Sequence, residues 1–285
     1  MNASLQRSSV TRVPRVLSIA GSDSGGGAGI QADLKAFAAC GVHGMTAITA
    51  ITAQNTVGVT GVHNVPPETI LAQVRVVSSD IGVDAVKIGM LGNAETVAAV
   101  AAALDELPSG TPVVLDPVMV AESGAQLLDS DARAALTQLL LPRATVITPN
   151  VPEAWALVAE ADVSEDAPPA DDDLAALARR LRALGPDVVI ITGGHRRAAT
   201  DVFYDGQTLL EIPGERHPDG AAHGSGCTHS SALAAGLAWG ESPVDAARRA
   251  KAIASDAVAA GLSEIGAGAG PVDAIGLPGA RLRRR

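Results

Sequence analysis

A short segment in the last third of the chain combines residue types suited to group transfer. It consists of Gly224, Ser225, Gly226 and Cys227 and leads directly into an expected helix over 228–239. Successive backbone N–H groups at the start of such a helix could bind the oxygens of a transferring phosphoryl group. We also expect the helix start to lower the pKa of the Cys227 thiol and so provide a thiolate base. The alternative is a buried cysteine that only fills space.

Two carboxylates follow predicted strands and could bind a divalent cation. Asp116 ends the strand over 113–116, and Glu153 follows the strand over 145–148 in the sequence Asn150-Val151-Pro152-Glu153. Mg²⁺ takes oxygen ligands and often keeps its waters, so these two side chains are the candidate metal ligands. The same pattern also predicts a capping box, in which Asn150 and Glu153 only begin a helix. A helix or turn cap is likewise the alternative for Asp116.

A glycine-rich segment over 21–29 follows the first predicted strand and opens a helix. Bare glycines allow backbone N–H groups to approach a ligand closely. The glycine spacing differs from that of dinucleotide-binding proteins, and no acid ends the second strand to bind a ribose. A Walker A loop is excluded because the only lysines are Lys35, Lys87 and Lys251, and none follows a glycine. The alternative is a chain turn that binds nothing.

Short β-rich runs alternate with helical segments rich in Ala and Leu. The expected strands cover 15–20, 45–52, 85–89, 113–116, 145–148 and 188–192. This alternation predicts an α/β fold of three layers, α/β/α, with a mainly parallel central sheet. Runs at 202–205 and 208–212 flank Gly206 and Gln207 and predict a small antiparallel hairpin at one edge. Ligands bind beyond the carboxyl ends of parallel strands, so the loops after these strands should form the site.

Composition and charge restrict the kind of protein further. The chain has 285 residues, a formal net charge of -10 and only 2% aromatic residues, which argues against a nucleic-acid partner. No run approaches the roughly 20 apolar residues of a membrane span, so we expect a cytoplasmic protein without membrane contact. We predict one domain over 15–275, with disordered termini at 1–14 and 276–285. The histidines lack metal-ligand spacing, so no zinc site is expected.

With these motifs in place, the sequence resembles the hydroxymethylpyrimidine/phosphomethylpyrimidine kinases of the ribokinase superfamily, which are related to pyridoxal kinase. The resemblance covers about 15 to 272. It is carried by seven ordered motifs: AGSDSGGGAGIQADLK at 20–35, TAQNT at 52–56, KIGML at 87–91, LDPVM at 115–119, TPNVPE at 148–153, GGH at 193–195 and GSGCT at 224–228.

The resemblance implies a ribokinase-like fold, a homodimer and a reaction. ATP, with Mg²⁺, would phosphorylate 4-amino-5-hydroxymethyl-2-methylpyrimidine and then its monophosphate, giving a diphosphate for thiamin biosynthesis. The pyrimidine would lie against Gly21, Asp33, Gln54, Met90 and Val118. The ATP side would include Asn150, Thr192 and Gly194. The chemistry agrees, because the Gln54 carboxamide offers both a donor and an acceptor and Met90 offers a polarizable apolar face.

Two positions depart from the family pattern. Ser225 stands where relatives often have threonine, and Thr192 stands where they often have a lysine facing phosphate. Without that lysine, charge neutralisation must come from Mg²⁺, backbone amides or an arginine, and Arg196 and Arg197 are the nearest arginines in sequence. Relatives outside this branch commonly place an aspartate where this chain has Cys227.

Three other functions stay open at this point. Pyridoxal kinase is the nearest alternative function, because some pyridoxal kinases also have a cysteine at the position of Cys227. A pyrimidine-binding protein without catalysis would explain the loss of the lysine at Thr192. A nicotinamide dehydrogenase is the weakest, because the acid expected after the second strand is missing.

Overall fold

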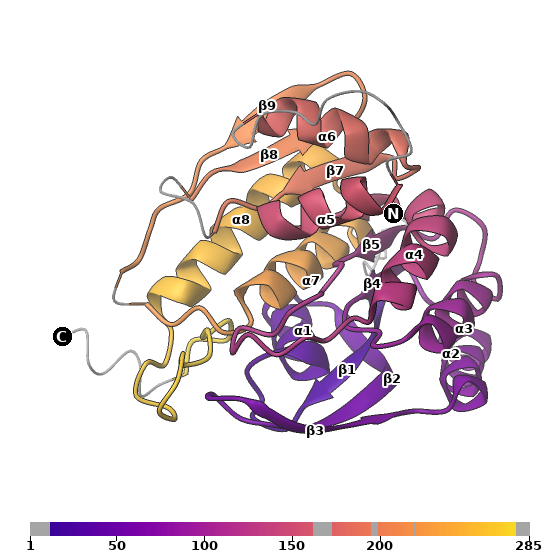
Figure 1. Ribbon diagram of the computed structural model, residues 1–285, viewed down its shortest axis with the longest axis horizontal. Helices are drawn as coiled ribbons and strands as arrows, with labels where there is room; N and C mark the ends of the chain where they lie inside the picture. The colour runs from indigo at the N-terminus through magenta and orange to yellow at the C-terminus, as the bar shows by residue number, and fades with distance from the viewer. Residues whose placement is uncertain (1–11, 162–172, 195–198, 219, 278–285) are drawn as a thin grey trace, which may run out of the picture.

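A β-sheet of nine strands runs through the part of the chain that the structure describes (Figure 1). The computed structural model describes residues 12–161, 173–194, 199–218 and 220–277. The strands are β1 (Arg15–Asp23), β2 (His43–Gln54), β3 (Val59–Asn64), β4 (Ala85–Ile88), β5 (Val113–Leu115), β6 (Val146–Ile147), β7 (Val188–Ile191), β8 (Asp201–Tyr204) and β9 (Leu209–Ile212). Their order in the sheet is β3-β2-β1-β4-β5-β6-β7-β8-β9.

The centre of the sheet is parallel, and both edges are antiparallel. Parallel pairing joins β2, β1, β4, β5, β6 and β7. β3 pairs antiparallel with β2, and β8 and β9 continue antiparallel from β7. The predicted mainly parallel sheet and its hairpin edge are therefore confirmed, whereas β3 was not predicted. The sequence pattern does not identify β3 as a strand, because β3 is almost fully exposed and its polar residues and glycine show no apolar alternation.

Helices cover the two faces of the sheet in separate groups (Figure 1). The helices are α1 (Gly29–Ala39), α2 (Pro67–Asp80), α3 (Ala94–Leu104), α4 (Ser130–Leu139), α5 (Val151–Ala161), α6 (Leu174–Ala183), α7 (Ser225–Ala238) and α8 (Pro243–Ala259), with a 3-10 turn η1 (Leu141–Arg143). α1, α7 and α8 pack together on one face, and α2 to α6 follow one another across the other. None of the helices in these described ranges is long and apolar enough to cross a membrane.

Neighbouring residues of each central strand point into different cores. Val16 packs with α1, α7 and α8, while Leu17 packs with the other helical layer. Val114 and Val113 divide in the same way on β5. Because strand side chains alternate between faces, a continuous apolar run is what a strand covered on both sides requires. The apolar runs in the sequence therefore marked the central strands correctly.

α7 is buried although its sequence is not strongly amphipathic. Every residue from 228 to 236 is buried, and most of them are Ala, Ser or Gly. A Cβ added at Gly236 would lie 2.9 Å from the Cβ of Ala246, so the small residue allows α7 to approach α8 closely. The helix begins at Ser225, three residues earlier than predicted, which brings Gly226 and Cys227 into its first turn.

Both chain ends are attached where they are described. The Pro14 carbonyl accepts a hydrogen bond of 2.8 Å from the His43 N–H, and the Asp273 carboxylate accepts bonds from the N–H groups of Gly276 and Leu277. Pro14, Gly276 and Leu277 thus form hydrogen bonds with the rest of the fold, whereas the disorder of the termini stays a prediction. The rest of the predicted disordered termini lies outside the described residues.

A fully buried lysine joins the layers at the centre of the molecule. Lys87, on β4, has 0% exposure, and its ammonium lies 3.0 and 3.2 Å from the two carboxylate oxygens of Asp33 on α1. Asp33 also accepts hydrogen bonds from Ser18 on β1 and Ser231 on α7. Burial opposes the charged ammonium, but Asp33 and the neighbouring Asp116 raise the pKa of Lys87 above its ordinary value. The ion pair therefore connects β1, α1, β4 and α7.

We predict that Lys87→Met lowers the free energy of unfolding by about 3–5 kcal/mol, because it leaves the Asp33 carboxylate buried without its counter-charge. Urea unfolding of the two proteins measures the loss. The double variant Lys87→Met/Asp33→Asn should recover much of it, since the amide keeps partners for Ser18 and Ser231 without a charge. A single variant as stable as the parent protein would contradict this account of the ion pair.

Candidate active site

A cavity of about 460 Å³ lies where the parallel strands end. Its wall takes residues from just beyond or at the carboxyl ends of successive strands. These residues are Gln54 at the end of β2, Met90 after β4, Asp116 after β5, Thr148 after β6 and Thr192 after β7. The opposite wall comes from the first turn of α7 and from α8. The predicted location beyond the strand ends is thus where this cavity lies.

The glycine-rich loop after β1 is organised by its own aspartate. The Asp23 carboxylate accepts hydrogen bonds from the N–H groups of Gly25, Gly27 and Ala28, at 2.8 to 3.0 Å. The Nε2 atom of His223 lies 3.1 Å from the same carboxylate. Burial opposes this charge, but the bond with His223 and the N–H donors lower the pKa of Asp23. Several of the N–H groups that we expected to face a ligand are therefore used inside the loop.

The glycine-rich loop presses against the start of α7. Gly224 precedes the helix with φ of 85°, a left-handed conformation that favours glycine. A Cβ at Gly224 would lie 1.8 Å from the carbonyl oxygen of Gly27. A Cβ at Gly27 would in turn lie 2.1 Å from the ring of His223. Gly224 is required because two backbones meet there, and Gly27 is required because the His223 ring packs against it.

The first turn of α7 forms part of the cavity wall. Gly224, Ser225, Gly226 and Cys227 all line the cavity, as predicted from their sequence. The N–H groups of a first helical turn have no carbonyl partner within the helix, and they carry the positive end of the helix dipole. The wall at 224–227 is therefore suited to bind an anion.

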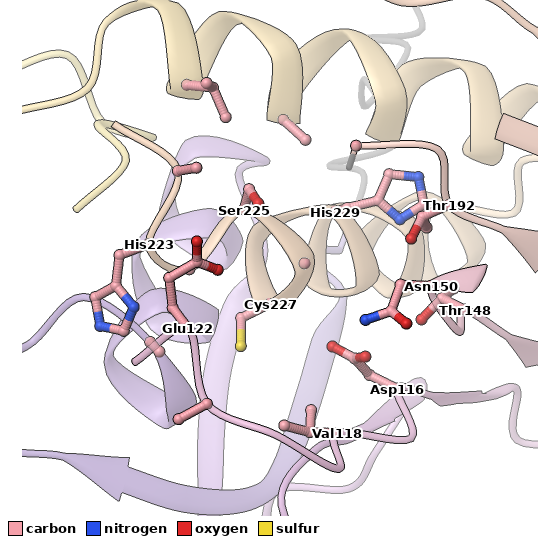
Figure 2. A pocket seen from close by; sticks show the side chains of 18 of the residues that line it. Asp116, Val118, Glu122, Thr148, Asn150, Thr192, His223, Ser225, Cys227 and His229 are labelled. Carbon is pink, nitrogen blue, oxygen red and sulfur yellow. The ribbon is translucent and has the colours of Figure 1, made fainter. Parts of the chain in front are cut away.

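The Cys227 side chain points into the pocket on the side of Val118 and Asp116 (Figure 2). Burial, together with Asp33 and Asp116, raises its pKa to about 12, although Lys87 acts in the opposite direction. The prediction that the helix start lowers this pKa was wrong for the free protein. Two buried carboxylates and the loss of water outweigh the helix start, so Cys227 is a protonated thiol at neutral pH.

Asp116 and Glu153 lie at the same edge of the cavity. Ser230 donates a hydrogen bond of 2.9 Å to Asp116, and Lys87 lies 4.0 Å from it, yet burial raises the pKa of Asp116. Burial and the Asp116 charge also raise the pKa of Glu153 to about 7. The described residues contain no cluster of three or more metal-ligating side chains. Two repelling carboxylates nevertheless fit Mg²⁺, which often takes only one or two from a protein.

Glu153 also forms the predicted capping box with Asn150. The Asn150 N–H donates to the Glu153 carboxylate at 2.9 Å, and the Glu153 N–H donates to the Asn150 side chain at 2.9 Å. The N–H of Met119 approaches the second Glu153 oxygen at 3.4 Å. The cap is therefore present at the start of α5, and the same carboxylate still faces the cavity.

The residues expected around a pyrimidine divide into two groups. Gly21, Gln54, Met90 and Val118 line the cavity. The Thr52 hydroxyl donates a hydrogen bond of 2.9 Å to the Ser22 carbonyl and lies 3.2 Å from the Gln54 side-chain oxygen. A Cβ at Gly21 would lie 3.0 Å from the sulfur of Met90, so the glycine leaves room for that side chain.

Asp33 does not line the cavity and is fully buried. The expectation that it contacts a ligand directly is therefore corrected. Asp33 binds Lys87, and Lys87 is the residue of this pair that lines the cavity.

On the expected ATP side, Asn150, Thr192 and Gly194 line the cavity. The Thr192 N–H donates to the Pro149 carbonyl at 2.8 Å, and its hydroxyl approaches the same oxygen at 3.4 Å. Arg196 and Arg197, the arginines nearest in sequence, lie outside the described residues.

Sequence reasoning missed several charged residues of the cavity. They are Asp23, Lys87, Glu122, Asp201, Glu215, Arg216 and Lys251, together with His217, His223 and His229. A lysine within the apolar strand over 85–89 was a usable signal, because a charge on a doubly covered strand needs a buried partner. The sequence contains no such signal for Asp201, His229 and Lys251. These three residues lie far apart along the chain, and only the fold brings them together.

We predict that Glu153→Gln removes a pH dependence of stability in the protein without Mg²⁺. The folded pKa of about 7 exceeds the ordinary 4.5, so the folded protein binds more protons between these values. Stability should therefore fall as pH rises from about 4.5 to about 7, by as much as about 3 kcal/mol. Glutamine keeps the capping box and cannot ionise.

Urea unfolding at pH 5 and pH 8 in a chelator measures this difference. Glu95→Gln, in the exposed first turn of α3, is the matched control and should leave the pH dependence unchanged. Parallel stability profiles for the parent protein and Glu153→Gln would disprove the prediction.

Comparison with known proteins agrees with this geometry. Residues 23–273 match the family model described as phosphomethylpyrimidine kinase. A hydroxymethylpyrimidine/phosphomethylpyrimidine kinase of Rhizobium meliloti is 50% identical over 259 residues, which are 90% of this chain and 95% of that protein. A thiamine biosynthesis bifunctional protein of Geobacter sulfurreducens is 45% identical over 262 residues, covering 91% of this chain and 52% of that protein.

A solved structure shares the fold as well. The pyridoxal kinase of Staphylococcus aureus in complex with ADP superimposes with a TM-score of 0.82 at 34% identity, covering 93% of this chain and 94% of that chain. The expected ribokinase-like architecture is thus confirmed. Since the family model and the Rhizobium relative both extend over most of its length, the chain belongs to the phosphomethylpyrimidine kinase family.

Proposed function

We propose that this protein transfers the γ-phosphoryl group of ATP to the hydroxymethyl oxygen of 4-amino-5-hydroxymethyl-2-methylpyrimidine, and then a second one to the monophosphate. One observation carries the proposal. The first turn of α7 lines the same cavity as the Met90 and Val118 side chains and α8. The name of the Rhizobium relative supports the two substrates, and that of the Geobacter relative supports a place in thiamin biosynthesis.

The pyrimidine fits the end of the cavity nearest to β1 and β2. Met90 and Val118 offer apolar faces to a flat ring, and the Gln54 amide lies beside the Thr52 hydroxyl. A ring with an exocyclic amine and ring nitrogens presents donors and acceptors, and the Gln54 carboxamide can bind one of each. In the proposed binding mode, the hydroxymethyl group of the pyrimidine points toward Cys227 and the start of α7.

Phosphoryl transfer asks a protein mainly for alignment and for stabilisation of charge. The N–H of Ser225 donates to the Ala222 carbonyl, so the N–H groups of Gly226 and Cys227 are the donors left for the transferring group, and the buried Lys87 adds a positive charge near them. Asp116 and Glu153 would hold Mg²⁺, which when bound neutralises phosphate charge. Their shared cavity edge and mutual effect on pKa support this assignment.

Cys227 is the candidate general base for the first phosphorylation. Its raised pKa means that a thiolate is scarce in the free protein but strongly basic once formed. The second substrate already carries an ionised phosphate oxygen and needs no base. Cys227 therefore acts as a base in the first phosphorylation only.

Three further expectations are proposals of the same kind. A homodimer is supported by exposed apolar side chains on β2, on β3 and on the loop between them, namely Ile51, Val62 and Val57. Sedimentation that reports a monomer would exclude it. One domain over 15–275 agrees with the continuous sheet, and limited proteolysis tests it. A cytoplasmic location is the third of these proposals, and cell fractionation tests it.

Product analysis tests the function directly. The protein is incubated with ATP, Mg²⁺ and the free pyrimidine, and the products are separated by anion exchange. The expected products are the monophosphate and then the diphosphate. Nucleotide and pyrimidine binding without any phosphorylated product would instead indicate a binding protein that has lost catalysis.

A pyridoxal kinase activity is the second candidate, because the structure of the Staphylococcus aureus pyridoxal kinase superimposes so closely. Both alcohols are heteroaromatic and could lie against Met90. Measuring kcat/KM for each alcohol under the same conditions decides between them, and a higher value for pyridoxal would replace the proposed substrate.

We predict that Cys227→Ala slows the first phosphorylation by roughly 10² to 10⁴ and slows the second much less, because only the first acceptor must lose a proton. The anion site should persist, since it consists of backbone N–H groups. Single-turnover measurements with each acceptor give the two rates.

The second cysteine of the chain provides the control. Cys40 follows α1 and does not line the cavity, so Cys40→Ala should leave both rates unchanged. Equal slowing of both steps in Cys227→Ala would instead assign Cys227 a role in shaping the phosphate site.

A further inference from the structure

One histidine lies between the two loops at the acceptor side of the cavity. His223 directly precedes Gly224, where the wall at 224–227 begins, and its ring packs against Gly27 in the loop after β1. Its backbone N–H donates to the Gly270 carbonyl at 3.2 Å, and its carbonyl accepts from the Val272 N–H at 3.0 Å. The position of the ring is therefore fixed by its backbone as well as by its neighbours.

The two ring nitrogens of His223 have different surroundings. Nε2 lies 3.1 Å from the Asp23 carboxylate, and an ionised carboxylate can only accept, so Nε2 carries a proton. Among the described residues, Nδ1 has no hydrogen-bond partner, and Figure 2 shows a ring nitrogen directed toward the side of the pocket where Cys227 lies. The side chain is 8% exposed and lines the cavity. A buried ring nitrogen without a partner is suited to bind a polar group of a ligand.

The second acceptor of the proposed reaction brings negative charge to this side of the cavity. A phosphate monoester carries a charge of about −1.5 to −2 at neutral pH. The residues that surround the pyrimidine in the proposed binding mode are all uncharged; they are Gly21, Gln54, Met90 and Val118. The phosphate of the monophosphate is attached to the hydroxymethyl oxygen, so it also points toward the start of α7. It needs a positive partner that the free pyrimidine does not need.

Most basic side chains of the cavity lie elsewhere or are already paired. Lys87 is bound to Asp33. Lys251 and His229 lie beside Asp201 on β8, toward the other edge of the sheet from the loop after β1. The remaining ones, apart from His223, come from the segment after β9; they are Arg216 and His217.

His223 is the basic side chain that adjoins both the loop after β1 and the start of α7. When both ring nitrogens carry a proton, Nδ1 is a charged donor. Hydrogen bonds from charged donors to phosphate oxygens are short and strong. The bond to Asp23 leaves Nδ1 available for such a bond and holds the ring in place.

We propose that His223, positioned by Asp23, binds the phosphate group of the monophosphate acceptor and so serves the second phosphorylation only. Nδ1 donates to the acceptor phosphate, while the N–H groups of Gly226 and Cys227 bind the group that is transferred. The free pyrimidine has no phosphate and makes no bond with His223. This inference rests on the proposed function, because it requires the monophosphate as a second acceptor.

Calorimetric binding of three ligands to His223→Gln, each without the others, tests the inference. The glutamine amide can reach Asp23 in place of Nε2, but it has no group in place of Nδ1. Loss of a charge-assisted bond should weaken binding of the pyrimidine monophosphate on the order of 10- to 100-fold. The affinities for the free pyrimidine and for ADP should stay the same, since neither places a phosphate at His223.

His223→Asn is the complementary variant. Its amide can take the place of Nδ1, so a donor remains in the cavity, but the bond to Asp23 is lost. We expect its monophosphate affinity to lie between those of the parent protein and His223→Gln. If His223 only joined the two loops, His223→Asn would be the weaker variant, and the monophosphate and the free pyrimidine would be affected alike. Either result would overturn the inference, as would equal weakening of ADP and the monophosphate.

NMR of labelled histidine rings in the parent protein gives a measurement that needs no folded variant. The monophosphate should shift the His223 ring resonances, and the free pyrimidine should shift them much less. Equal shifts with the two ligands would contradict the proposed bond. His43→Gln is the matched control, because His43 is exposed at the start of β2 and does not line the cavity. It should bind all three ligands like the parent protein.

The same measurements separate this inference from the proposed function. If the parent protein bound the free pyrimidine but not the monophosphate, the proposed second phosphorylation would fail and the inference with it. If the parent protein phosphorylated both acceptors and His223→Gln bound the monophosphate normally, the inference alone would be wrong.

Discussion

The site depends on one positive charge that has no contact with water. The Lys87 ammonium is buried below the cavity and bound to Asp33, and Asp33 is held by Ser18 and Ser231. A buried charge is tolerated only with a partner and hydrogen bonds, so β1, α1, β4 and α7 must keep their relative positions. The ion pair therefore fixes the relative positions of the elements that form the cavity wall around Lys87.

A second constraint is the contact between two glycine-containing loops. Asp23 gathers three N–H groups of the first loop and binds His223, which precedes the second. Gly27 and Gly224 then allow the backbones to meet. Since the first loop adjoins the expected pyrimidine side and the second begins α7, this contact fixes the acceptor side of the cavity relative to the anion site. A side chain at either glycine would move the two apart.

The sequence predicted the succession of strands and helices along the chain well, and it predicted the surroundings of individual side chains poorly. Apolar runs identified the central strands because both faces of each strand are covered, and the Asn150 and Glu153 cap followed from a local pattern. β3 was missed because its residues are mostly exposed. The errors at Asp33 and Cys227 share a cause, since burial and distant charges set both and neither is encoded locally. The cluster of Asp201, His229 and Lys251 likewise exists only after folding.

The raised pKa of Cys227 has a consequence for how the site is charged. In the empty cavity, Asp33 and Asp116 place two negative charges near the thiol and Lys87 places one positive charge there. A thiolate would add a further negative charge, so the protonated form is favoured. A protonated thiol is a poor nucleophile, which protects Cys227 from oxidation and unwanted alkylation while no substrate is bound. Asp116 and Glu153 would hold a divalent cation in the proposed site, and its positive charge would offset part of this negative charge and so favour the thiolate that the proposed base requires.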